Sequence, residues 1–145
     1  MKRIVLDTDV VVAALRSPTG ASAELMRLLA AGKITILASV ALALEYEAVC
    51  ISPEHVLASG LSRKQVETFV DAVIGMSEPV EIHYLWRPML RDAGDEMVLE
   101  AAVNGQAEAL VTFNRRDFED SLPRFGIEVL APREALARIR RRHTK

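Results

Sequence analysis

The sequence feature that most constrains the fold is the apolar run at residues 4–6, which shows no alternation of polar and apolar side chains. A strand with one solvated face alternates, so an unbroken run is typical of a strand buried on both faces of a parallel sheet. Comparable strand candidates follow at residues 34–37, 109–112 and 127–130, and a weaker one at residues 80–84.

Helical spacing of apolar residues separates these strand candidates. We expect helices over residues 10–15, 21–31, 40–49 and 63–74, and further helices that begin at Pro53, Asp95 and Pro132. Strands that alternate with helices in this way predict an α/β fold with a mostly parallel sheet.

Length and composition fit an ordinary globular chain. The 145 residues predict a single domain over residues 1–145, which ends in a basic tail at about residues 138–145. The lone Cys50 excludes an intramolecular disulfide or a CxxC metal site and is expected to be a core residue. No signal peptide and no apolar stretch of about 18 residues is visible, so we expect a cytoplasmic protein without a membrane span.

Acidic and polar residues gather where the predicted strands end. Ligands of open parallel sheets bind beyond the carboxyl ends of the strands, which makes these residues candidates for a site. They come from four segments: Asp7 and Asp9 after the first strand, Glu45 in the helix after the second, Asp92 and Asp95 before the fourth, and Thr112, Asn114 and Asp117 after it.

Carboxylates collected in one cleft would repel one another and raise one another's pKa values, and a cation removes that cost. Oxygen ligands without a cysteine or histidine cluster suit Mg²⁺ or Mn²⁺ rather than Zn²⁺. Such ions activate water and stabilise the charge that develops on a phosphodiester, which is nuclease chemistry. Taken singly, Asp7 and Asp95 are better explained as helix caps. Glu45 differs, because a lone carboxylate beside the apolar face of its helix is costly, and an outward-facing, solvated position is the alternative for it. The metal site is predicted by their combination.

The order of these acids resembles that of a PIN domain, and most closely the VapC-like group of toxin–antitoxin components. The resemblance runs over about residues 2–136 and rests on four stretches: IVLDTDVVVAAL, SVALALEYEAV, RDAGDEMVLEAAV and VTFNRRDF. It implies a three-layer α/β/α fold around a parallel sheet of about five strands. It also implies a metal-dependent endoribonuclease, often dimeric, that hydrolyses RNA phosphodiester bonds.

Position by position, the resemblance carries the three core acids of the family onto Asp7, Glu45 and Asp95. It implies that Asp7 and Asp95 contact Mg²⁺ or Mn²⁺ directly, and that Glu45 binds metal or orients the attacking water. Asp117 matches a more variable acid of the metal site, and Asp92 does so less closely.

The same resemblance assigns supporting roles. Thr8 and Thr112 would be polar supports, and Asn114 would line the pocket. Asp9 stands where an Asn is common in the family, and it adds negative charge beside the expected metal. Asn114 stands where many relatives have Asp, although Asn also occurs there in VapC-like members. Ala93-Gly94 replaces a common Pro-Asp, so that loop loses an acid.

The sequence gives weaker evidence for binding partners than for the metal site. Arg115 and Arg116 lie beside the proposed site and are candidate RNA contacts, because phosphate contacts dominate RNA affinity. The basic tail is better explained as a solvated helix end. The family resemblance implies a cognate antitoxin and a homodimer, and the apolar helices at residues 21–31 and 39–49 could provide such a surface or simply pack in the core.

Two other functions fit parts of the sequence. Asp7-Thr8-Asp9 after an apolar strand resembles the motif of haloacid-dehalogenase-like phosphatases, in which the first Asp is a covalent nucleophile. That function leaves Glu45 without a role, and Lys33 and Lys64 are poorly placed for its lysine. A PIN domain that binds RNA or a partner without catalysis is the third candidate, because Asp9 and Asn114 depart from the family pattern.

Overall fold

The computed structural model describes residues 2–83 and 93–143 and contains one five-stranded sheet. The strands lie in the order β3-β2-β1-β4-β5, and every neighbouring pair is parallel. Their bounds are β1 (Arg3–Leu6), β2 (Thr35–Ala38), β3 (Glu78–Pro79), β4 (Ala109–Val111) and β5 (Glu128–Leu130). The predicted α/β class and the parallel sheet of five strands are confirmed.

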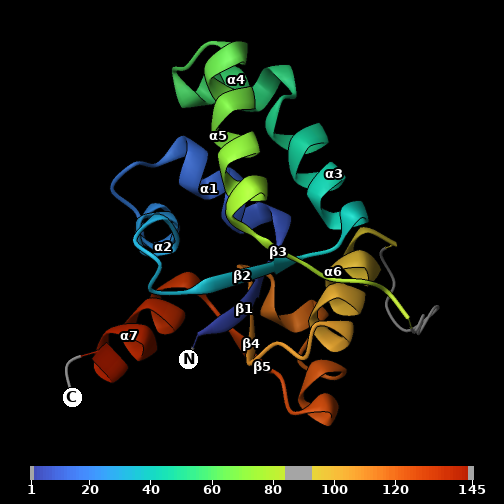
Figure 1. The fold of residues 1–145 in the computed structure, drawn as a ribbon. Coiled ribbons are helices and arrows are strands. Elements are labelled where there is room, and N and C mark those ends of the chain that lie inside the picture. Colours follow the sequence, from blue (N-terminus) through green and yellow to red (C-terminus); the bar gives the residue numbers. More distant parts are fainter. Residues whose placement is uncertain (1, 84–92, 144–145) are drawn as a thin grey trace.

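Helices cover both faces of this sheet. They are α1 (Thr8–Arg16), α2 (Ala21–Ala30), α3 (Val40–Cys50), α4 (Pro53–Ser59), α5 (Arg63–Met76), α6 (Ala93–Asn104) and α7 (Pro132–His143), with 3-10 turns η1 (Arg115–Asp117) and η2 (Leu122–Phe125). Helices α1 to α5 lie on one side of the sheet and α6 and η2 on the other, which gives three layers, while α7 packs against α2 (Figure 1). Within the described residues, no helix is long and apolar enough to cross a membrane.

Strand β1 lies at the centre of the sheet, and this explains its unbroken apolar run. Ile4, Val5 and Leu6 have no exposed surface, because both neighbouring strands and both helical layers cover them. Large buried side chains of β2, β4, α2, α3, α6, η2 and α7 join them in one hydrophobic core. The core therefore fixes the end of β1, where Asp7 follows.

The prediction of a strand at residues 80–84 was wrong in position. The strand consists of Glu78 and Pro79, which pair with Leu37 and Ala38 of β2, and residues 81–83 are not in a strand. Both strand residues are exposed and β3 is the sheet edge, so no apolar run marks it. A proline is tolerated there because an edge strand has one side without a partner.

The strand order places a switch point between β1 and β4. From β1 the chain first builds outward to β2 and β3, and then returns to the other side of β1 to form β4 and β5. The Asp7 N–H donates to the Val111 carbonyl at 2.9 Å, and the Thr112 N–H donates to the Leu130 carbonyl at 2.9 Å. The first bond holds the ends of β1 and β4 side by side and the second holds those of β4 and β5, at the point where parallel sheets bind ligands.

Candidate active site

Asp7 is held by hydrogen bonds to both of its carboxylate oxygens. It caps α1, where its Oδ1 accepts the Thr8 N–H at 2.8 Å, and its Oδ2 accepts the Thr112 hydroxyl at 2.8 Å. Asp7 is only 7% exposed and Thr112 is fully buried. The register of β1 and β4 sets this contact, since Leu6 lies opposite Val111 and the next residues are Asp7 and Thr112.

Asp9, in the first turn of α1, reaches across to the loop after β4. Its Oδ2 accepts the Phe113 N–H at 3.1 Å and the Asn114 side-chain amide at 3.0 Å. The Asn114 N–H in turn donates to the Thr112 hydroxyl at 2.9 Å. The other carboxylate oxygen of Asp9, Oδ1, is buried and has no hydrogen-bond partner. The two oxygens of one side chain are therefore in different surroundings.

Three carboxylates interact around Asp9. Burial raises the pKa of Asp9 to about 7, and the charges of Asp7 and Asp95 add to the rise, while the nearby Phe113 and Val10 N–H groups oppose it. Asp95 reaches this group from the first turn of α6, where it is half-buried. The negative charges that act on Asp9 thus come from two segments of the chain, Asp7 beside it and Asp95 in α6.

Glu45 comes to the same end of the sheet on α3 and is half-buried. Its neighbour Tyr46 is fully buried and donates a hydrogen bond from its hydroxyl to the Leu6 carbonyl, at the last residue of β1. Burial, with the nearby Asp7 charge, raises the pKa of Tyr46, so the phenol keeps its proton. This role of Tyr46 was not predicted from the sequence. The sequence cue for it is a polar hydroxyl in an otherwise apolar helix.

Asp117 lies outside the group formed by Asp7, Asp9 and Asp95. It is exposed in η1 and helps to line a hollow of about 410 Å³, together with Phe113, Asn114, Arg115, Arg116 and Glu119. Over residues 2–83 and 93–143, no three Asp, Glu, His or Cys side chains are close enough to hold one metal ion together. The structure therefore does not bring Glu45 or Asp117 together with Asp7, Asp9 and Asp95, and Asp92 lies outside the described residues.

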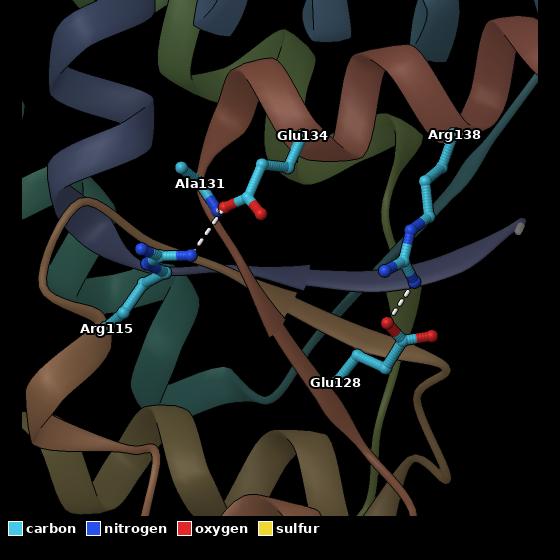
Figure 2. A network of polar contacts seen from close by, with 5 residues as sticks. All are labelled: Arg115, Glu128, Ala131, Glu134 and Arg138. Atoms are coloured by element: carbon cyan, nitrogen blue, oxygen red, sulfur yellow. Dashed lines mark hydrogen bonds and ion pairs between the residues drawn. The ribbon is translucent and has the colours of Figure 1, made fainter.

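Arg115 ties the loop after β4 to the last helix (Figure 2). Its guanidinium donates to Glu134 Oε1 at 2.8 Å, and the same oxygen accepts the Ala131 N–H at 3.0 Å. A second ion pair joins Arg138 of α7 to Glu128 of β5. The role of Glu134 was not predicted from the sequence. Its cue is the position of this acid three residues after Ala131, the residue before the helix, as in a capping box.

Comparison with known proteins identifies the family of the chain. The profile of the PIN domain matches residues 3–116, which is most of the chain. The chain belongs to the PIN-domain family. This PIN domain is also similar in fold to a chain in the crystal structure of VapBC2 from Rickettsia felis bound to a DNA fragment from their promoter. That match has a TM-score of 0.58 and 17% identity, and it covers 89% of this chain and 98% of that one. No match is found among curated protein sequences.

The oxygen donors around Asp9 are of the type that binds the divalent cation implied by the family of this PIN domain, although no three acids of the described residues converge on one position. The nearby donors are carboxylate and hydroxyl oxygens, which suit Mg²⁺ or Mn²⁺, and the buried Oδ1 of Asp9 lacks any partner. Cys50 offers no alternative chemistry. It is fully buried, and burial raises the pKa of its thiol to about 11, so it stays protonated in the core as expected.

Proposed function

We propose that this PIN domain is a Mg²⁺- or Mn²⁺-dependent endoribonuclease that hydrolyses RNA phosphodiester bonds. The observation that carries the proposal is the group of Asp7, Asp9 and Asp95 at the switch point of the sheet, where Asp9 has an oxygen without a partner. Charges of one sign that face one another beside a parallel sheet are stabilised by a cation.

A bound Mg²⁺ or Mn²⁺ ion would supply an activated water and charge stabilisation for the phosphodiester. In this proposal Asp7 and Asp95 bind the ion, and Glu45 binds it or orients the water. Asp117 is a further, outer ligand. Thr112 holds the Asp7 carboxylate by its hydrogen bond of 2.8 Å, and Thr8 does so through its backbone N–H.

In this proposal, the loop that follows β4 binds the RNA. Arg116 lines the hollow beside Asn114 and Asp117, which gives phosphate a cation close to the acids. Arg115 lines the same hollow, but its guanidinium already bonds to Glu134. We therefore assign the larger share of phosphate contact to Arg116, and to Arg115 a share in holding the loop.

The proposal includes a biological setting, in which the chain acts in the cytoplasm as the toxin of a toxin–antitoxin pair and forms a homodimer. The similarity in fold to a chain of the VapBC2 complex supports an antitoxin partner. Helix α3 also leaves Val40 and Leu44 exposed, at 75% and 59%, along the stretch that leads to Glu45. Large exposed apolar side chains are typical of surfaces that bind another chain.

The phosphatase function is disfavoured because its mechanism needs a lysine beside the nucleophile Asp7. Lys33 is exposed and precedes β2, at the end of the sheet opposite to Asp7, and Lys64 is exposed in the first turn of α5.

The test is cleavage of an end-labelled RNA pool by the purified chain, with Mg²⁺ or Mn²⁺ and with EDTA. The matched variant carries Asp7→Asn and Asp95→Asn, which keep side-chain size and remove charge. We expect metal-dependent cleavage by the parent chain and none by the folded variant. RNA binding without cleavage, in folded protein free of any partner, would instead support the non-catalytic module.

A further inference from the structure

Phe113 presents a phenyl ring at the surface beside the candidate active site. It is 55% exposed, more than any other aromatic residue over residues 2–83 and 93–143. The preceding residue, Thr112, is fully buried and donates its hydroxyl to Asp7 Oδ2. A single exposed apolar side chain is ordinary on a protein surface. Phe113 differs because of how its backbone is held and which residues lie around it.

Hydrogen bonds fix the backbone on both sides of Phe113. Its own N–H donates to Asp9 Oδ2 at 3.1 Å. Before it, the Thr112 N–H donates to the Leu130 carbonyl at 2.9 Å. After it, the Asn114 N–H donates to the Thr112 hydroxyl at 2.9 Å. A side chain on such a support loses little conformational entropy when a ligand covers it.

Phe113 also lines the hollow of about 410 Å³ in the loop after β4, together with Asn114. The charged residues of the lining balance, since two are basic and two are acidic: Arg115, Arg116, Asp117 and Glu119. Sites for small ligands have volumes of about 300–1,000 Å³ and combine apolar walls with a few polar groups. A hollow lined in this way suits a neutral, planar group.

An unpaired nucleobase is such a group, and RNA brings it together with a phosphate. Unpaired bases are recognised by stacking on aromatic rings, and every base has a flat face for this contact. Arg115 is turned to Glu134 of α7 (Figure 2). Arg116 has no ion pair within the part of the chain that the structure describes, so it is available to the phosphate of a nucleotide whose base lies on Phe113.

We propose that Phe113 is the stacking platform for an unpaired nucleobase beside the phosphodiester bond that is cleaved. This inference rests on the proposed endoribonuclease function and names its substrate class as single-stranded RNA. In a duplex, neighbouring bases cover both faces of each base, so no face is left for the phenyl ring. Because Asp9 holds the Phe113 N–H and lies beside Asp7, the stacked base would set which phosphate faces the acids.

The experiment measures the RNA affinity of the full-length chain by fluorescence anisotropy, in EDTA to prevent cleavage. The probes are a labelled pool of single-stranded RNA and the same pool annealed to its complementary strands. Loss of one stacked base weakens binding about five- to a hundredfold, so we expect Phe113→Ala to weaken binding of the single-stranded pool at least fivefold. Binding of the duplex should change less than twofold.

Two further variants separate stacking from apolar contact. Phe113→Trp keeps an aromatic ring and should bind the single-stranded pool at least half as tightly as the parent chain. Phe113→Leu keeps apolar bulk without the ring and should weaken binding as much as Phe113→Ala does. The matched control is Phe125→Leu, which removes an exposed phenyl ring of η2 outside this hollow and should change affinity less than twofold.

The salt dependence of binding separates the ring from the cations. Phe113→Ala removes no charge, so the slope of log affinity against log salt should equal that of the parent chain. Arg116→Ala should reduce this slope by about one counterion. An equally reduced slope for Phe113→Ala would show that the ring acts only by positioning Arg116, and would overturn the proposal.

The remaining outcomes distinguish this proposal from the function on which it rests. Equal single-strand affinities of the parent chain and folded Phe113→Ala, or full binding by Phe113→Leu, would overturn the stacking role alone. A change in the oligomeric mass of Phe113→Ala, measured by light scattering without RNA, would overturn it in favour of a contact between copies of the chain. Absence of both RNA binding and RNA cleavage in the parent chain would overturn the endoribonuclease function as well.

Discussion

Asn114 and Asp9 form an amide–carboxylate pair across 105 residues of sequence, with the Asn114 amide 3.0 Å from Asp9 Oδ2. Both residues depart from the PIN-family pattern to which the sequence is similar, since Asn is common at position 9 and Asp at position 114. The structure shows that the two departures are in contact. Taken together, they keep one acid and one amide at this contact and exchange their positions.

This pairing predicts the outcome of a double-mutant cycle. Asn114→Asp would set two carboxylates in contact, and we expect it to lower the free energy of unfolding by about 1–2 kcal/mol in metal-free protein at pH 8. Adding Asp9→Asn should recover most of the lost free energy of unfolding, because one amide–carboxylate pair is formed again. Urea unfolding measures both effects, and additive losses would contradict the coupling.

Asp9 also predicts a pH dependence of stability. The pKa of Asp9 is raised to about 7 in the folded chain, above the ordinary value of 3.8. At a pH between these two values, Asp9 is protonated in the folded state and ionised in the unfolded state. Stability should therefore fall as pH rises from about 4 to about 7, by about 2 kcal/mol after allowance for solvent screening at this half-buried group.

The measurement is chemical unfolding in EDTA at pH 5, 6, 7 and 8, for the parent chain and for Asp9→Asn. The difference in the free energy of unfolding between the two proteins separates the effect of Asp9 from that of the other acids. We expect this difference to increase up to about pH 7 and then to level off. A free-energy difference that stays constant across this range would show that Asp9 does not titrate there.

Tyr46 offers a test of how α3 is positioned. Tyr46→Phe removes the hydroxyl that donates to the buried Leu6 carbonyl and leaves that carbonyl without this partner. We expect a loss of about 1–2 kcal/mol in the free energy of unfolding, measured by urea titration. Because Glu45 is the adjacent residue, RNA cleavage should also slow at saturating RNA. Ala48→Ser, on the exposed side of the same helix, serves as the control and should change neither quantity.

Divalent cations should stabilise the folded chain. Cation binding to the native state alone adds about 2.7 kcal/mol at a concentration 100 times the Kd, and this should appear as a rise in Tm with added Mg²⁺ or Mn²⁺. The Asp7→Asn, Asp95→Asn variant should lose that rise, while its metal-free Tm is measured alongside. An equal rise in both proteins would place the cation elsewhere on the chain.

The two neighbouring arginines should respond differently to alanine substitution. Arg116→Ala should weaken RNA binding and reduce its salt dependence by about one counterion, with little change in stability. Arg115→Ala should lower stability as well, because Glu134 loses its partner. RNA affinity at several salt concentrations and urea unfolding separate the two effects. Equal effects on stability would argue against the assigned division of roles.

The positions of Asp7 and Thr112 could be predicted from the sequence because they depend on strand ends. Unbroken apolar runs locate β1 and β4, and in a parallel sheet their carboxyl ends share one edge. The positions of Glu45 and Asp95 follow less directly, since a helix can present a residue on any face. The structure makes both half-buried, and it brings Asp95 close enough to Asp9 to affect its pKa.

Other features depend on contacts that no local pattern encodes. Strand β3 is short, exposed and contains Pro79, so only its pairing with β2 defines it. The bond between Arg115 and Glu134 joins a loop to a helix, and either residue alone resembles a solvated charge. The unpaired Oδ1 of Asp9 likewise appears only when the loop after β4 is in place.

Glu134 serves two segments with one oxygen, since Oε1 accepts both the Ala131 N–H at the start of α7 and the Arg115 guanidinium. The loop beside the acids and the C-terminal helix should consequently open as one cooperative unit. Native-state hydrogen exchange would then give the amides of Phe118 and Ala135 similar opening free energies. A helix at the far end of the chain thus contributes to the stability of the loop that carries Asn114.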